Sequence, residues 1–174
     1  MESAEPQWLT DDEQRTWRAY LHATTLLEDH LDRQLQRDAK MPHIYFGLLV
    51  TLSEAPHRRL RMTELAIQSK ITRSRLSHAI ARLEKNGWVR REDCPSDKRG
   101  QFAVLTDEGL GVLRQSAPGH VSTVRQALFA RLSPEQQKWG GAGWGRMGGP
   151  GERDRECARA PARAGGAARQ ARRA

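Results

Sequence analysis

The sequence predicts a mostly α-helical domain that carries a small β-hairpin, an α+β fold. Apolar residues recur every three or four positions over most of the chain between residues 11 and 132, as expected where one side of each helix is buried. Residues 88–91 and 101–105 alternate instead, and a polar segment between them predicts two strands and a tight connection. A chain of 174 residues has room for one domain with a sizeable core and an appendage.

Two helices are predicted first. Thr10 is a suitable N-cap, and the three acids that follow it favour the positive end of a helix dipole, so the first helix should run from residue 11 to about Asp38. The second helix should start near Pro42, a good first-turn residue, and end before Pro56.

Two short helices and the hairpin come next. Residues 60–62 read as a brief extended piece, after which Thr63 should cap one short helix. After a turn at residues 69–71, Thr72 should cap a second short helix that ends at Asn86-Gly87, where glycine suits a left-handed position. The strand patterns at 88–91 and 101–105 then flank a hairpin tip at residues 95–100.

A long helix should follow the hairpin. Thr106 is its predicted cap, and Pro118-Gly119 predicts a break or kink within it. Ser133 opens one more helix, which should end almost at once because the composition changes there.

Positive charge is concentrated in the middle of the chain. Residues 58–100 hold 12 Lys and Arg against 5 acids, whereas residues 1–57 hold 5 against 10. A basic block within an otherwise acidic or neutral body indicates a polyanion-binding surface, and its layout favours double-stranded DNA.

The helix predicted at 72–86 has the pattern of a DNA-reading element. Leu76, Ile80 and Leu83 share an inward face, and the opposite face is small and polar with cationic shoulders. Small side chains let a helix lie deep in the major groove, where Ser, Arg and His can bond base edges. We expect base contacts from Ser74, Arg75, Ser77 and His78, and phosphate contacts from Arg58, Arg59, Arg73, Arg82 and Lys98.

The hairpin tip carries the second DNA-binding prediction. Lys98 and Arg99 at the end of a β-ribbon can reach the adjacent minor groove, whose narrow A·T stretches attract arginine. Asp97 is predicted to orient an arginine through a charge-assisted hydrogen bond.

Over roughly residues 11–138 the chain resembles the MarR family of winged helix-turn-helix regulators. The resemblance lies in the order of elements and in three motifs: LEKNGWV at 83–89, DKRG at 97–100, and LTDEG at 105–109. It implies a winged helix-turn-helix domain at 11–138, with a DNA-binding lobe at about 58–105 and flanking dimerisation helices at about 11–38 and 106–138.

The same resemblance implies a homodimeric, ligand-responsive repressor on a palindromic operator, with Arg99 in the minor groove. Members commonly bind a small aromatic or anionic effector in a cleft between the dimer helices and the DNA-binding lobe. The candidate lining residues here are Trp17, Tyr20, His43, Tyr45 and Phe46. This chain departs from the oxidation-sensing relatives, which carry a cysteine near the start of the first helix, and we expect Cys94 to be an ordinary small residue.

The final 36 residues differ in composition from the rest of the chain. They comprise 9 Gly, 9 Ala and 8 Arg among others and no Leu, Ile, Val or Phe, so residues 139–174 should form a disordered tail. Two explanations stay open: a native basic tail, or a GC-rich gene read out of frame after about Lys138. In either case the family's last dimerisation helix is interrupted.

Other function classes lack their motifs. The sequence holds no zinc-hydrolase, P-loop, nucleophile-elbow or dinucleotide fingerprint, and two cysteines make neither a disulfide framework nor a four-ligand zinc site. We therefore expect no enzyme activity, no cofactor, no metal and no membrane partner, and a cytoplasmic location. The alternatives are a winged-helix module that binds a protein, and a regulator impaired by the loss of its C-terminal dimerisation helix.

Overall fold

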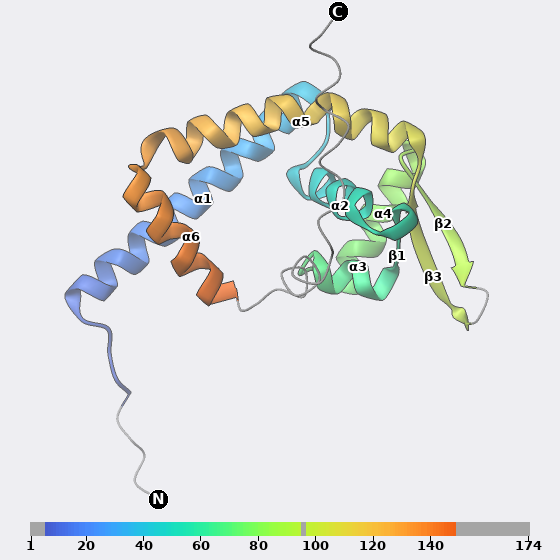
Figure 1. The fold of residues 1–174 in the computed structure, drawn as a ribbon. Coiled ribbons are helices and arrows are strands. Elements are labelled where there is room, and N and C mark those ends of the chain that lie inside the picture. Colours follow the sequence, from blue (N-terminus) through green and yellow to red (C-terminus); the bar gives the residue numbers. More distant parts are fainter. Residues whose placement is uncertain (1–5, 95–96, 149–174) are drawn as a thin grey trace, which may run out of the picture. The chain divides into compact units, whose positions relative to one another are not determined.

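The computed structural model describes residues 6–94 and 97–148, without the side chains of 97–99 and 147–148. The chain divides into two compact units, residues 1–128 and 129–174. The predicted α+β class is confirmed, because unit 1 is mostly helical and holds one three-stranded antiparallel sheet (Figure 1).

Unit 1 begins with two helices. Helix α1 spans Asp11–Ala39, and Thr10 caps it: its hydroxyl accepts from the Glu13 N–H, and the Glu13 side chain accepts from the Thr10 N–H. Helix α2 spans His43–Glu54 after Pro42. The short 3₁₀ helix η1 at Pro56–Arg58 then leads into the DNA-binding lobe predicted from residue 58 on.

The helix-turn-helix lies between the first strand and the hairpin. Strand β1 spans Arg59–Arg61, helix α3 Met62–Gln68 and helix α4 Arg73–Lys85. Thr72 caps α4 as predicted. Thr63, the predicted cap of α3, lies inside that helix instead, because α3 begins one residue earlier and Arg61 takes the cap position.

The end of α4 confirms the prediction for Asn86-Gly87. The N–H of Trp88 donates to the Leu83 carbonyl and that of Gly87 to the Glu84 carbonyl, a Schellman arrangement. Gly87 has φ +76°, a left-handed conformation that favours glycine.

The hairpin is longer than its sequence pattern. Strand β2 spans Val89–Cys94 and β3 spans Asp97–Leu105, so most of the predicted tip belongs to the second strand. The strand order is β1-β3-β2, with a register shift between Asp93 and Cys94. The inner face of the sheet carries Leu60, Val89, Ala103 and Leu105, all buried in the core.

Helix α5 spans Asp107–Ala127 and is capped by Thr106, as predicted. Of the predicted break or kink, the break is wrong, since the helix continues through Pro118, and the kink stays a prediction. A proline in a helix interior removes one main-chain donor and crowds the carbonyl four residues earlier, which can bend a helix without ending it.

Unit 2 contains the 3₁₀ helix η2 at Phe129–Arg131 and helix α6 at Pro134–Gly148. We expected this helix to end almost at once, but it extends into the glycine-rich segment. Its first turn is well capped, because Ser133 and Gln136 exchange backbone-to-side-chain hydrogen bonds of 2.8 and 3.2 Å. Residues 149–174, most of the predicted tail, lie outside the described residues.

Candidate nucleic-acid interface

Helix α4 presents a polar, cationic face above an apolar one. Leu76, Ile80 and Leu83 are each at most 1% exposed, which confirms the predicted inward face. The side chains predicted to contact DNA from this helix are all exposed: Arg73, Ser74, Arg75, Ser77, His78 and Arg82. The burial of one face thus fixes which residues the helix can offer to a partner.

Two of the predicted phosphate contacts, Arg58 and Arg59, lie at the end of η1 and the start of β1. Each forms an ion pair with an acidic side chain of this chain. Arg58 Nη1 lies 2.9 Å from Asp107 Oδ1. Arg59 stacks over the Phe102 ring at 4.1 Å and approaches Glu92 at 3.7 Å, on the outer face of the sheet. These pairs hold Arg58 against the start of α5 and Arg59 on the outer face of the sheet.

The predicted wing residues Asp97, Lys98 and Arg99 begin strand β3, but their side chains lie outside the described part of the chain. Their roles therefore stay predictions. Cys94, at the end of β2, is buried, and its Sγ accepts a hydrogen bond of 3.3 Å from Arg61 Nη2.

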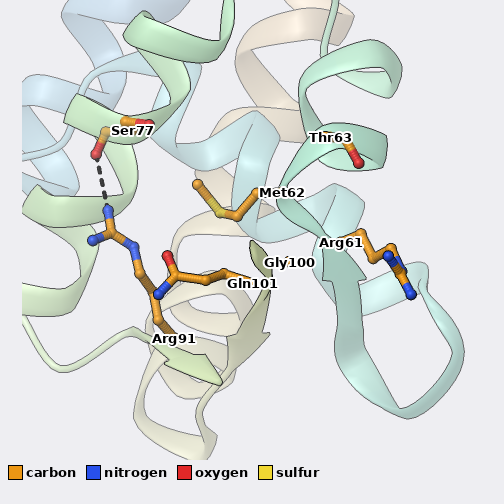
Figure 2. Close-up of a pocket in the computed structure, with 7 residues that line it drawn as sticks. All are labelled: Arg61, Met62, Thr63, Ser77, Arg91, Gly100 and Gln101. Atoms are coloured by element: carbon orange, nitrogen blue, oxygen red, sulfur yellow. Dashed lines mark hydrogen bonds between the residues drawn. The ribbon is translucent and has the colours of Figure 1, made fainter. Parts of the chain in front are cut away.

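A cavity of about 350 Å³ opens between α3, α4 and the hairpin. Figure 2 shows the side chains of Met62, Arg91 and Gln101 gathered within it, whereas the Arg61 side chain points away from them. It is lined by Arg61, Met62, Thr63, Ser77, Arg91, Gly100 and Gln101. Of these, the sequence pointed to Ser77 and, through the tip motif, to Gly100; the others it missed.

The residues predicted to line an effector cleft are not brought together as one group. Trp17 and Tyr20 stack on each other at 6.0 Å and are 49% and 39% exposed. His43 meets α1 further along, with Nδ1 2.9 Å from Glu28 Oε2. Because Trp17 precedes Glu28 by 11 residues, the two groups are separated by about 16 Å along α1.

His43 and Phe46 instead meet His120 of α5. The His120 ring lies 4.4 Å from the Phe46 ring and 5.3 Å from the His43 ring. Burial, and to a lesser degree the charge of His43, lowers the pKa of His120, while Glu28 acts in the opposite direction. Tyr45 is half-buried beside the core. Sequence reasoning did not single out His120, because only the packing of α5 brings it to α2.

Comparison with known proteins identifies the fold. The model of the MarR family matches residues 45–100. The chain is 72% identical to Sco3205, a MarR family transcriptional regulator from Streptomyces coelicolor determined in complex with DNA, with a TM-score of 0.80 over 86% of this chain and 92% of that one. AbsC, from the same organism, is 40% identical with a TM-score of 0.77, covering 82% and 96%. The chain belongs to the MarR family.

Curated relatives agree with this assignment. HosA of Escherichia coli O111:H-, a transcriptional regulator, is 30% identical over 122 residues, 70% of this chain and 87% of that protein. YetL of Bacillus subtilis, a transcriptional repressor, is 35% identical over 92 residues, and the match spans 53% of this chain and 54% of that protein. The predicted winged helix-turn-helix fold of a MarR family transcriptional regulator is therefore confirmed.

The described residues form neither a metal-binding cluster nor a membrane-spanning helix. No group of three or more His, Cys, Asp or Glu side chains in this part of the chain is arranged to hold a metal ion. None of its helices combines the length and the apolar character that crossing a bilayer requires.

Proposed function

We propose that this MarR family member is a sequence-specific DNA-binding regulator that acts by binding DNA, not by catalysis. The exposed polar face of α4 is the observation that carries the proposal. Ser74, Arg75, Ser77 and His78 project from a helix whose opposite side is anchored in the core, as a helix must be to enter the major groove. Sco3205, at 72% identity, was determined in complex with DNA.

The contacts fall into two groups. Ser74, Arg75, Ser77 and His78 read base edges, with Arg75 the best candidate for a guanine. Phosphate contacts come from Arg58, Arg59, Arg73, Arg82 and Lys98, with Arg99, oriented by Asp97, in the minor groove.

The functional form is a homodimer on a palindromic operator. Within residues 11–26 of α1 no side chain is buried, although apolar residues recur at helical spacing there. Trp17, Tyr20 and Leu21 are 49%, 39% and 43% exposed. A second copy would cover this apolar stripe and set two recognition helices one helical turn of DNA apart. Helix α6 has few apolar residues for a dimerisation helix. An impaired dimer is therefore the alternative.

Repression would result from steric block of a promoter. Binding to chromosomal DNA would place the protein in the cytoplasm.

The competing function is a winged-helix module that binds a protein partner, and such a module does not require cations on both the helix and the wing. The net charge of residues 58–100 therefore favours DNA.

A small aromatic or anionic effector is the proposed signal. The cavity beside α4 suits such a ligand, because Arg91 and Gln101 supply donors and Met62 an apolar wall. If an aromatic carboxylate such as benzoate acts there, its addition should release bound DNA, and Gln101→Leu should weaken the response.

DNA binding is tested with a duplex selected by the protein from a random pool. Arg75→Ala and Arg99→Ala should each weaken binding by about 1–3 kcal/mol in a fluorescence anisotropy titration. Arg33→Ala, which removes the same charge from an exposed site on α1, is the matched control and should leave the affinity unchanged. Affinity should also fall steeply with salt, because each neutralised phosphate releases counterions. A selection that enriches no sequence would reject the proposal.

A further inference from the structure

Arg91 is a charged residue on the face of β2 that packs toward the helices. In the sheet register it pairs with Ala103, which is fully buried, and its neighbours Arg90 and Glu92 lie on the opposite face and pair with each other. The Arg91 side chain is 30% exposed and reaches from β2 toward α4. An arginine in this position must find partners on the helix.

It has three contacts with α4, at two levels of the helix. Arg91 Nη2 donates to the main-chain carbonyl of Ser77 at 3.2 Å, the bond drawn in Figure 2. The Arg91 main-chain N–H donates to Glu84 Oε1 at 3.0 Å, and Arg91 Nε lies 3.4 Å from Glu84 Oε2. Glu84 is itself 30% exposed, so this pair is less screened by water than a surface salt bridge.

The spacing of these contacts restrains the helix. Ser77 and Glu84 are seven residues apart, about 10 Å along the helix axis. Two attachments separated by two turns oppose both rotation and sliding of α4 against the hairpin. A rotation of about 20° would move side-chain tips at a radius of 5–6 Å by about 2 Å, enough to break a hydrogen bond to a base edge.

We propose that Arg91 is a positioning residue for DNA recognition, which fixes the rotation of α4 relative to the wing so that Ser74, Arg75 and His78 meet base edges together. This inference rests on the proposed function. It assigns Arg91 no contact with DNA: its guanidinium is directed at the helix carbonyl and at Glu84. Operator discrimination, rather than general affinity for DNA, should therefore depend on it.

The test uses the full-length protein, the selected duplex and a shuffled duplex of the same composition. Arg91→Gln removes the Glu84 ion pair, and Arg91→Lys keeps the charge but cannot reach both attachments. Glu84→Gln keeps an oxygen that accepts from the Arg91 N–H and loses only the charge. The matched control is Arg90→Gln, the same change one residue earlier on the other face of the sheet.

Arg91→Gln should lower affinity for the selected duplex about tenfold and leave affinity for the shuffled duplex unchanged, so that the specificity ratio falls by the same factor. Its slope of log affinity against log salt should equal that of the wild type, because no phosphate contact is lost. Arg91→Lys and Glu84→Gln should show smaller losses in the ratio, and Arg90→Gln none. Circular dichroism melts establish that each variant is folded at the assay temperature, and Glu84→Gln provides the measurement if Arg91→Gln is not.

Three results would overturn the inference. One is a wild-type specificity ratio in Arg91→Gln or, if that variant is unfolded, in Glu84→Gln. Another is an equal loss on both duplexes with a salt slope reduced by about 0.9, which would make Arg91 a phosphate contact. The third is a ratio that falls equally in Arg90→Gln. Failure of the wild type to prefer the selected duplex would instead reject the proposed function, so the two failures are distinguishable.

Discussion

Gly109 lets the start of α5 pack closely against Trp88, a residue between α4 and β2. A methyl group on Gly109 would lie 2.1 Å from the main-chain oxygen of Trp88 and 2.9 Å from Leu105 Cδ1. The same junction is held by Thr106, whose N–H donates to the Trp88 carbonyl at 3.1 Å and whose hydroxyl donates to the Gly87 carbonyl at 2.7 Å. Replacement of Gly109 by alanine must therefore move the start of α5 away from Trp88 and Leu105.

The cost follows from the distances. An ordinary carbon–oxygen contact of about 3.3 Å requires a displacement of about 1 Å, which breaks both Thr106 hydrogen bonds. Their loss costs about 1 kcal/mol each, and the overpacking costs a further 1–3 kcal/mol. The higher helix propensity of alanine returns at most about 1 kcal/mol. Gly109→Ala should thus lower the free energy of unfolding by about 2–4 kcal/mol.

Thermal unfolding followed by circular dichroism at fixed protein concentration measures this effect. At about 3 °C per kcal/mol, Gly109→Ala should lower Tm by about 6–12 °C. Gly111→Ala is the matched control, because beyond the adjoining residues and backbone of its own helix nothing lies within 4 Å of the added methyl group; it should raise stability by about 0.5–1 kcal/mol. If Gly109→Ala melts within about 2 °C of the wild type, the close approach at Trp88 does not limit stability and the reasoning is wrong.

Two further predictions concern the recognition helix and the helix junction. Thr72→Ala removes the hydroxyl that accepts from the Arg75 N–H at 3.3 Å and should cost about 1 kcal/mol in urea unfolding, whereas Thr72→Ser should cost much less. Because burial lowers the pKa of His120 in the folded state, that state binds protons less readily than the unfolded one, and Tm should fall as pH drops from above 6.5 through the lowered pKa. His120→Gln should flatten this pH dependence, and an unchanged profile would contradict it.

Local signals were sufficient to predict most element types. Thr10, Thr72 and Thr106 each cap the helix predicted for them, and Gly87 adopts the predicted left-handed conformation. Each of these features depends on a side chain and a few neighbouring backbone groups, so the sequence contains the whole cause. Strand ends were less predictable: β3 starts at Asp97 because pairing with β2 continues beyond the alternating residues.

In the candidate interface, too, some residues could be predicted from the sequence and others could not. The outward residues of α4 follow from periodicity alone, since burying Leu76, Ile80 and Leu83 dictates the opposite face. Arg91 and Glu84 were not predicted, because in the sequence they are two ordinary charged residues of a basic block. Only the register of β2, which turns Arg91 toward the helices, gives them partners.

By itself the sequence determined most of the helices, three of their caps, the basic block and the exposed face of α4, because these depend on contacts within a few residues. The tertiary structure decided which charges are held against each other and which remain available. It placed Arg91 on Ser77 and Glu84, Arg58 on Asp107, and His120 on Phe46. Such pairings join residues that are far apart in the chain, and they form only when sheet register and helix packing bring the side chains within bonding distance.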